Sequence, residues 1–459
     1  MSITATYYEP KCWSPAYNPI PWSVESNKNA EIDFSYVFDL YINGSATYDY
    51  RIKQRPNPLG IGMVDVSPIV QSYINLTDYS AESGWTKPFR DSSEIVAQLD
   101  VKIGEEYIGT DGALTIFDGL GATGEPNYTG PDFENNGHVR VLPSALDFQT
   151  ERTIMAAQYD YPFYSTYIMG GTGQFLKRDS NDITVREGEY HTLAFLNWND
   201  LAAGSYASPV QGINVEYFGA TGSISSTFYQ NITTNGGGPQ TSAAYVSAVR
   251  SQQYDMITFG CGPAQLTLPV GTTYYEVKAY YKATGTPSTA PNTVASETVT
   301  FTLSTECNDL YTPVRLSWLN DLGGRDYFTF DMKYEKSTSS TESEYYQSEL
   351  NWSGLRPVVY DNGTNDTNEN WQRGGNKSYN RNVTESFLIE SNWLDQTKVD
   401  FLGYIAESPS VWAYIGTNPI PYTVKIDNPS YSYKLVKQEK LVQASFNLTY
   451  TKLQQKQNL

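Results

Sequence analysis

Apolar and polar residues alternate most clearly near the start of the chain. Every second residue from Phe34 to Ile42 is apolar, so one face of a predicted strand turns toward a core. The strand ends at Asn43-Gly44, a pair that favours the positive φ angles of a tight hairpin turn. Apolar positions resume over Tyr48–Ile52 on a predicted return strand. The pattern predicts a β-hairpin.

Two segments show helical spacing instead. Ser67-Pro68 predicts a helix start, with Ser67 as the N-cap and Pro68 at the first helical position. The apolar residues that follow with this spacing are Ile69, Val70, Tyr73 and Ile74. The clearest helix of the chain covers about 392–406, where apolar residues lie broadly on one side: Leu394, Val399, Leu402 and Ile405.

Short strand-like runs bounded by Gly, Pro and Asn fill much of the remaining chain. They cover residues 95–99, 113–117, 190–196, 266–269, 274–281, 297–303, 314–318, 327–330, 411–415, 422–426 and 441–450. Two polar stretches, Ser337–Ser343 and the Asn-rich run 361–370, are predicted to be exposed loops.

These patterns predict a mostly-β fold with several β-sandwich or immunoglobulin-like domains, a few short helices and long loops. Residues 1–85 form a predicted N-terminal β domain with a short helix. Residues 86–255 form an irregular β domain with long loops, and 256–305 an immunoglobulin-like unit. Residues 306–459 form a C-terminal β domain with one packed helix.

Composition agrees with a β fold. The chain of 459 residues contains 38 Tyr, 35 Gly and 24 Pro, while charged residues make up only 18%. Aromatic residues suit pleated, half-buried surfaces, and Gly and Pro supply turns. The net charge of −19 disfavours binding to nucleic-acid phosphates. We interpret the negative charge as a source of solubility. Alternatively, carboxylates line a passage through which DNA slides without binding.

The cysteine pattern indicates no metal site and no disulfide framework. Cys12, Cys261 and Cys307 are widely spaced, odd in number and include no CxxC pair, so reduced thiols are expected. Met1–Glu9 lacks the features of a signal peptide, and no apolar run approaches the length of a membrane span. A protein made and assembled in a cytoplasm is predicted.

Two motifs suggest chemistry that their contexts do not support. Gly119–Gly124 spells GxGxxG, but Glu125–Pro131 follows and cannot begin the helix that would hold a pyrophosphate. An ordinary glycine loop is predicted. The only histidines are His138 and His191. Cys-His catalysis would require one of the three cysteines beside one of them, and none has a recognisable nucleophile context.

Carboxylates and aromatic residues give the remaining candidates. Asp160 has no acidic neighbour, and Asp179, Asp182, Glu187 and Glu189 lie in a predicted loop, so we interpret them as solvated surface rather than a hydrolase pair. One aromatic cluster favours an interface or core, with glycan stacking as the alternative: Tyr159, Tyr161, Phe163, Tyr164 and Tyr167. The sequence predicts no enzyme, no cofactor, and no catalytic, cofactor-binding or metal-binding residue.

Three parts of the chain, in order, resemble tail and baseplate structural proteins of phages that infect Bacteroidetes, including the crAss-like podophages. The first part comprises Ser14–Ile20, Tyr36–Ile42 and Gly62–Ser67. The second is similar to the "LNxxGGxDxFTF" signature of those proteins and comprises Tyr311–Asn320, Gly323-Gly324 and Tyr327–Phe330. The third comprises Ser408–Trp412 and Ile420–Val424. In the signature we predict a hairpin with Gly323-Gly324 at the turn, where these glycines allow positive φ.

The resemblance implies a virion protein of a phage tail, assembled in the host cytoplasm. The leading hypothesis is a subunit of a closed ring below the portal or near the baseplate that helps to build the DNA passage. Its expected partners are further copies of itself, other tail, portal or baseplate proteins, and passing DNA bound without sequence specificity. No membrane insertion is expected.

A ring repeats one heterologous contact, so each subunit needs two complementary faces. The loop Gly119–Gly137 and the strand Leu441–Tyr450 are the predicted contacts. The alternative is a receptor-binding or glycan-binding adaptor or fibre at the tail surface. A glycan hydrolase ranks last, because it would require a paired-carboxylate cleft.

Overall fold

The structure is a computed structural model of the chain. It describes residues 3–8, 10, 13–74, 89–91, 96–108, 114–117, 139–147, 173–196, 210, 212–230, 256–281, 293–304, 312–347, 351–353, 356–358, 375–416, 421–427, 443–451 and 454–455. The chain divides into two compact units. The first comprises Met1–Cys307, Ser317–Tyr327 and Ser408–Ser410; the second comprises Asn308–Leu316, Phe328–Glu407 and Val411–Leu459.

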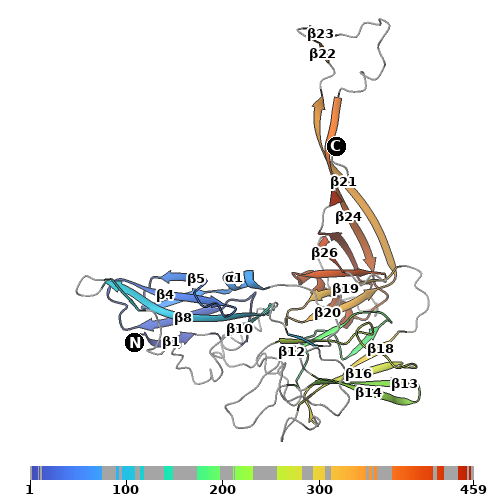
Figure 1. Ribbon diagram of the computed structural model, residues 1–459, viewed down its shortest axis with the longest axis horizontal. Helices are drawn as coiled ribbons and strands as arrows, with labels where there is room; N and C mark the ends of the chain where they lie inside the picture. The colour runs from blue at the N-terminus through green and yellow to red at the C-terminus, as the bar shows by residue number, and fades with distance from the viewer. Residues whose placement is uncertain are drawn as a thin grey trace. The chain divides into compact units, whose positions relative to one another are not determined.

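Strands dominate the described residues, and the mostly-β prediction is confirmed (Figure 1). The sequence suggested four segments, whereas contacts within the chain define two units. The strands belong to several separate sheets, each with its own strand order.

The first unit contains a core formed by two sheets. Their strands are β1 (Ile3–Tyr8), β2 (Trp13–Pro15), β3 (Pro21–Ser26), β4 (Ile32–Ile42), β5 (Tyr50–Gln54), β6 (Ile61–Asp65), β8 (Ala97–Ile108), β9 (Leu114–Phe117) and β10 (Val139–Leu142). One sheet has the order β1-β3-β6; the other has the order β2-β10-β8-β4-β5, with β9 beside β8. Trp22 of the first sheet and Phe38 and Val101 of the second are fully buried in one cluster. Strands on both sides of residue 85 therefore share this core.

The predicted hairpin is present as β4 and β5. Leu40 lies opposite Tyr50, so the connection is longer than the two residues Asn43-Gly44. Asn43 has a φ of 53° and Gly44 a φ of 74°, as the turn prediction requires. The alternating face of β4 supplies buried residues to the core, which explains why the sequence pattern was informative.

The first predicted helix is short, and its predicted cap is wrong. Helix α1 (Ser67–Val70) is followed by the 3₁₀ turn η1 (Gln71–Tyr73), and Ser67 is the first helical residue rather than the N-cap. The N-cap is Val66, which makes no side-chain cap bond. Oδ1 of Asp65 accepts hydrogen bonds from the backbone N–H groups of Ser67 and Ile20 at 3.0 and 2.9 Å. Val70 is buried in the core.

A second core in the first unit also lies between two sheets. Its strands are β7 (Phe89–Asp91), β11 (Asp182–Val185), β12 (Thr192–Leu196), β13 (Gly212–Gly219), β14 (Gly222–Gln230), β15 (Met256–Gly260), β16 (Tyr274–Tyr281), β17 (Thr293–Val294) and β18 (Val299–Leu303). The orders are β12-β15-β7 and β11-β18-β16-β13-β14, with β17 beside β16. Phe259 of one sheet and Tyr275 and Phe301 of the other share one buried cluster.

Strands on both sides of residue 255, where the sequence suggested a domain boundary, belong to this core. One predicted strand, Leu266–Pro269, is wrong, because these residues form a bend and irregular chain between two turns. The N–H of Leu266 donates to the carbonyl of Gly262, and the N–H of Thr272 donates to the carbonyl of Pro269. Such local bonds replace the ladder that a strand would need.

The remaining strands are β19 (Val314–Leu319), β20 (Arg325–Phe330), β21 (Lys333–Gln347), β22 (Asn351–Ser353), β23 (Arg356–Val358), β24 (Gly375–Glu390), β25 (Val411–Ile415), β26 (Tyr422–Asp427), β27 (Ser445–Tyr450) and β28 (Gln454–Gln455). Most of them form one sheet of order β20-β19-β25-β26-β27-β24-β21, with β28 beside β24. Strands β22 and β23 pair with each other.

The C-terminal helix is confirmed as α4 (Gln396–Glu407). It begins after Asp395, whose Oδ1 accepts a 2.8 Å hydrogen bond from the backbone N–H of Lys398, so Asp395 caps the first turn. Val399, Leu402 and Ile405 are buried as the helical spacing predicted. Leu394, the fourth residue of the predicted apolar side, lies before the helix.

Candidate functional site

The segment with the resembling signature forms a tight polar turn between β19 and β20, which we call the polar turn (Leu319–Asp326). The buried side chain of Asn320 organises it. Oδ1 of Asn320 accepts hydrogen bonds from the N–H groups of Leu322 and Gly324, both at 3.0 Å. Its Nδ2 donates to Oδ2 of Asp326 at 3.0 Å. One side chain therefore holds both ends of the turn.

The polar turn is also bonded to a segment far away in the sequence. Nδ2 of Asn320 donates a second 3.0 Å bond, to the carbonyl oxygen of Leu176, which lies 144 residues earlier. The backbone N–H of Arg178 donates to both oxygens of Asp326, at 3.3 and 3.2 Å. The guanidinium of Arg178 pairs with the carboxylate of Asp321 through two hydrogen bonds, a bidentate geometry.

The carboxyl group of Asp326 has an unusual environment. Its residue is only 2% exposed, and burial raises its pKa to about 7. The hydrogen bonds from Asn320 and from the N–H of Arg178 oppose this rise, while the charge of Asp179 adds to it. The guanidinium of Arg178, whose backbone N–H bonds to Asp326, is paired with Asp321.

The two glycines of the polar turn have different functions. Gly323 has a φ of 93°, as predicted. Gly324 is not among the positive-φ glycines of the described chain, so only one glycine of the pair uses this freedom. A Cβ on Gly324 would lie 1.9 Å from the carbonyl oxygen of Leu176. Gly324 is therefore required for close approach of two backbones rather than for its own torsion angles.

A carboxyl with a pKa near 7 has the proton affinity of a general acid or base. Asp326 is nevertheless a poor candidate for that chemistry. Both of its oxygens accept hydrogen bonds from the protein, and the side chain is almost completely buried. A substrate could reach it only if the polar turn opened. The arrangement therefore serves to fix the chain.

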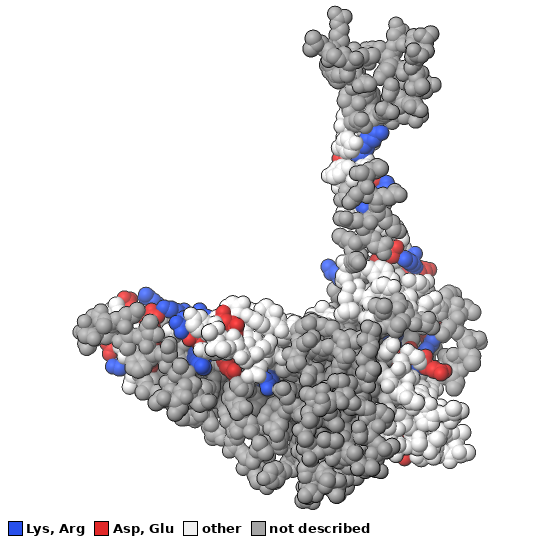
Figure 2. Space-filling model, in the orientation of Figure 1, with Lys and Arg blue, Asp and Glu red and all other residues white. Residues whose placement is uncertain are grey.

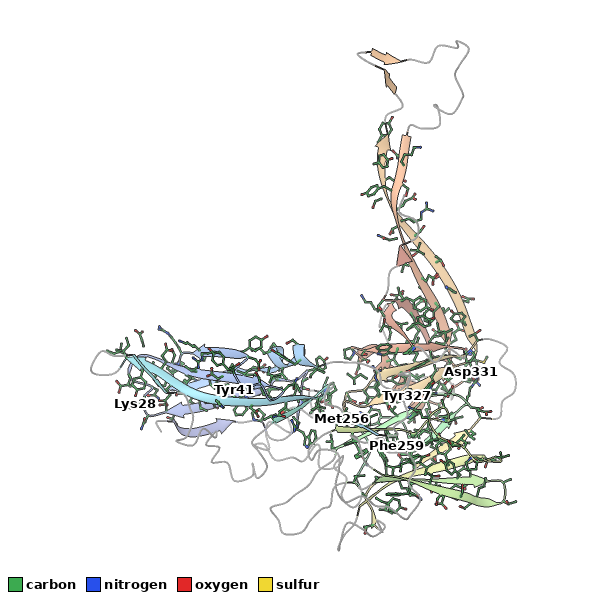
Figure 3. All side chains as sticks on the ribbon, viewed as in Figure 1. Lys28, Tyr41, Met256, Phe259, Tyr327 and Asp331 are labelled. Carbon is green, nitrogen blue, oxygen red and sulfur yellow. The ribbon has the colours of Figure 1, made fainter. Side chains whose placement is uncertain are left out.

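The structure brings the candidate residues Cys261 and His191 close together, but not as a nucleophile and its base. The Sγ of Cys261 donates to the backbone carbonyl of His191 at 3.6 Å. The His191 ring packs against the rings of Phe301 and Tyr327, with centroids 5.0 and 4.5 Å apart. Cys261 and His191 are both buried. The position of Tyr327 can be followed in Figure 3. These contacts are those of a core.

The candidate carboxylates at 179–189 participate in turns. Oε2 of Glu189 accepts a 3.0 Å hydrogen bond from the N–H of Arg186, and Oδ1 of Asp179 accepts one of 2.7 Å from the N–H of Ser180. Asp182 and Glu187 are exposed. The interpretation as surface agrees with these positions. Among the described residues, no group of three His, Cys, Asp or Glu could hold a metal ion.

Several candidates lie outside the described residues. They are Cys12, Cys307, His138, Asp160, the GxGxxG motif at 119–124, the loop 119–137, the run 361–370 and the aromatic residues Tyr159, Tyr161, Phe163, Tyr164 and Tyr167.

The sequence missed a long β-ribbon. The stretch Ser337–Ser343 was predicted to be a loop; that is wrong, because it lies within β21 (Figure 1). Strands β21 and β24 pair from Lys333↔Glu390 to Gln347↔Gly375. We call these two strands the ribbon. Cross-strand contacts such as Ser337 Oγ to Ser386 Oγ, at 2.7 Å, stabilise it. Its residues between Tyr334 and Tyr346 are mostly exposed, so no apolar alternation marks the strand.

The ribbon carries exposed aromatic and charged side chains. Tyr345, Tyr346 and Tyr379 are 50, 67 and 54% exposed, and the rings of Tyr345 and Tyr379 are 6.2 Å apart. Arg381 pairs with Glu342 at 2.5 Å across the two strands. In Figure 2, a few charged side chains of both signs are interspersed along this part of the second unit. Exposed tyrosines on an extended element suit contact with another molecule.

The strand Leu441–Tyr450, which was predicted to contact a neighbouring subunit, contributes to the chain's own sheet. Strand β27, within the predicted 441–450 segment, pairs with β24 on one side and with β26 on the other. Its backbone groups are therefore used within the chain, and it cannot add to a neighbouring sheet without leaving its own.

Neither helix of the described residues has the length and apolar character needed to cross a bilayer. A scan against protein-family models and a search of curated proteins find no match for this chain.

Proposed function

We propose that the chain is a structural protein of a bacteriophage tail, a subunit of a closed ring below the portal or near the baseplate that helps to build the DNA passage. The observation that carries the proposal is the structural role of the signature residues Asn320 and Asp326. In the polar turn, Asn320 and Asp326 bond to backbone groups of their own chain, as residues that fix a fold do. The resemblance of the three chain segments supplies the identity of the assembly.

Two further features support a role in an assembly. The ribbon exposes tyrosines, which bury much area at interfaces with few rotors to fix. The net charge of −19 suits a passage that DNA traverses without binding. Further copies of the chain and other tail, portal or baseplate proteins are the proposed partners, and the virion tail is the proposed location.

Negative-stain images of the purified protein, together with its mass in solution, test this proposal. Closed rings of one copy number are expected. A gel-shift assay at low salt should show no retardation of duplex DNA by those rings. A monomer at every concentration would contradict the ring, and strong DNA retardation would contradict the acidic passage.

The second candidate is a receptor-binding or glycan-binding adaptor at the tail surface. The exposed rings of Tyr345, Tyr346 and Tyr379 favour it, because aromatic faces stack on sugars. A trimer that binds defined sugars on a glycan array, with binding lost in Tyr346→Ala, would support this candidate over the ring.

A further inference from the structure

The outer edge of β21 is an extended surface for hydrogen bonding. The strand has 15 residues, and β24 pairs with one of its edges along the whole length. β21 is the last strand in the order of its sheet, so its other edge faces no further strand of the described chain. A long edge of this kind presents backbone N–H and C=O groups that can pair with another strand.

Proteins usually protect such edges with proline, a bulge or a charge turned toward the partner side. The middle of β21, Ser337–Thr341, consists of Ser and Thr only. Its register with β24 is continuous, and the shift occurs later, between Ser343 and Glu344. The central edge therefore has none of these protective features, and its chemistry suits pairing.

The charges on β21 indicate which strand would fit. An antiparallel second copy of β21, centred on Ser340, places Lys336 opposite Glu344 of the other copy. The two-fold symmetry repeats this pair. The same register places Tyr334 opposite Tyr346. Opposite charges and aromatic pairs stabilise neighbouring strands, so β21 complements itself.

The ion pair of Lys336 and the exposure of Tyr346 are compatible with that register. Nζ of Lys336 lies 2.8 Å from a Glu385 oxygen, and its side chain is 44% exposed. An ammonium group has three N–H donors, so a second carboxylate can be accommodated. Tyr346 is 67% exposed and therefore accessible to the other copy.

We propose that two copies of this chain associate through their β21 edges, antiparallel about Ser340, so that one continuous sheet crosses the interface. The contact is isologous, whereas a closed ring repeats a heterologous one. The inference therefore does not depend on the proposed function, and either can fail while the other stands.

Cysteine cross-linking of the full chain tests the register. Antiparallel neighbours have Cα atoms about 4.5–5.5 Å apart, within the range of a disulfide. Ser340→Cys should form disulfide-linked dimers under mild oxidation, and so should the double variant Ser337→Cys/Ser343→Cys. Ser337→Cys alone is the matched control, because two copies of residue 337 would be separated by about 20 Å. The unsubstituted protein gives the background from its own cysteines.

Charge reversal tests the complementarity in solution. Glu344→Lys should weaken dimerisation by about tenfold, measured by sedimentation at several concentrations. The double variant Lys336→Glu/Glu344→Lys should restore it. Glu407→Lys, with the same charge change on α4, should leave it unchanged. Circular dichroism verifies that each variant is folded.

Dimers of the 340 variant and of the 337/343 double variant, without dimers of the 337 control, are the expected result. Equal cross-linking at all positions would overturn the proposal, as would a folded protein that is monomeric throughout. Loss of dimer in Glu344→Lys without recovery in the double variant would overturn the proposed register.

Discussion

Asn320 and Asp326, six residues apart, are joined by a 3.0 Å hydrogen bond from Nδ2 to Oδ2 within a turn that is almost completely buried. The same Asn320 amide group donates to the carbonyl of Leu176, and Asp326 accepts from the N–H of Arg178. Two side chains thus connect the polar turn to a distant part of the chain. Asparagine and aspartate therefore have a structural role at these two positions of the polar turn.

Replacing Asn320 with alanine should destabilise the first unit by about 2–3 kcal/mol. The substitution leaves the N–H groups of Leu322 and Gly324 and the carbonyl of Leu176 without their present partner, and unsatisfied buried groups are costly. Thermal unfolding followed by circular dichroism measures the effect. Asn376→Ala, at an exposed position of β24, is the control and should change the midpoint by less than a degree or so. Equal midpoints for both variants would contradict this account.

The raised pKa of Asp326 predicts a pH dependence with a definite sign. Its pKa is about 7 in the folded protein and near its ordinary value of 3.8 in the unfolded chain. Between these values the folded state binds more protons, so this group's contribution to stability falls as the pH rises. The contribution is fully present below about pH 4 and lost as the pH passes through 7.

The variant Asp326→Asn isolates this effect, because asparagine has a similar shape and does not titrate. The stability difference, wild type minus variant, should decrease steadily from pH 5 to pH 8. Unfolding midpoints of both proteins at several pH values give this difference. Parallel curves across that range would show that Asp326 does not titrate there.

Alternation of side chains between a core and a more exposed face made some of the strands predictable from the sequence. β4 and β16 follow this rule, and their apolar positions match buried residues such as Phe38 and Tyr275. β21 does not follow it, because both of its faces are exposed along most of the strand, and its residues from Glu335 to Glu344 are all polar with turn-like composition. Its conformation depends on pairing with β24, which local patterns do not reveal.

The candidate site was predictable only in part. The signature indicated a hairpin between β19 and β20, and the positive φ of Gly323 follows from turn geometry. The partners Leu176 and Arg178 lie far away in the sequence, so neither spacing nor composition could identify them. A polar residue at each end of a tight turn, Asn320 and Asp326, was the one available signal.

The two glycines of the polar turn should respond differently to alanine. Gly323→Ala places a side chain at a φ of 93° with no atom nearer than 3.5 Å, so it costs the torsional strain of about 1–2 kcal/mol. Gly324→Ala places its Cβ against the carbonyl of Leu176 and should cost more, because the backbones must separate.

Gly188 provides the matched control for these two substitutions. Its φ is 85°, and no atom lies within 4 Å of the position of an added Cβ. Gly188→Ala should therefore resemble Gly323→Ala, with Gly324→Ala unfolding at a clearly lower temperature than either. An equal effect of all three would show that the close approach to Leu176 does not constrain the turn.

The buried hydrogen bond between Thr192 and Tyr327 gives a test of the core beside His191. The two hydroxyl oxygens are 2.8 Å apart, and both residues are buried. Tyr327→Phe removes one hydroxyl and should cost about 1 kcal/mol, whereas Tyr346→Phe on the exposed ribbon should cost almost nothing. The double variant Thr192→Val/Tyr327→Phe should lose less stability than the two single variants lose together. Each single variant leaves one buried hydroxyl without its partner, whereas the double variant removes both hydroxyls. Additive effects in thermal unfolding would mean that these hydroxyls do not interact.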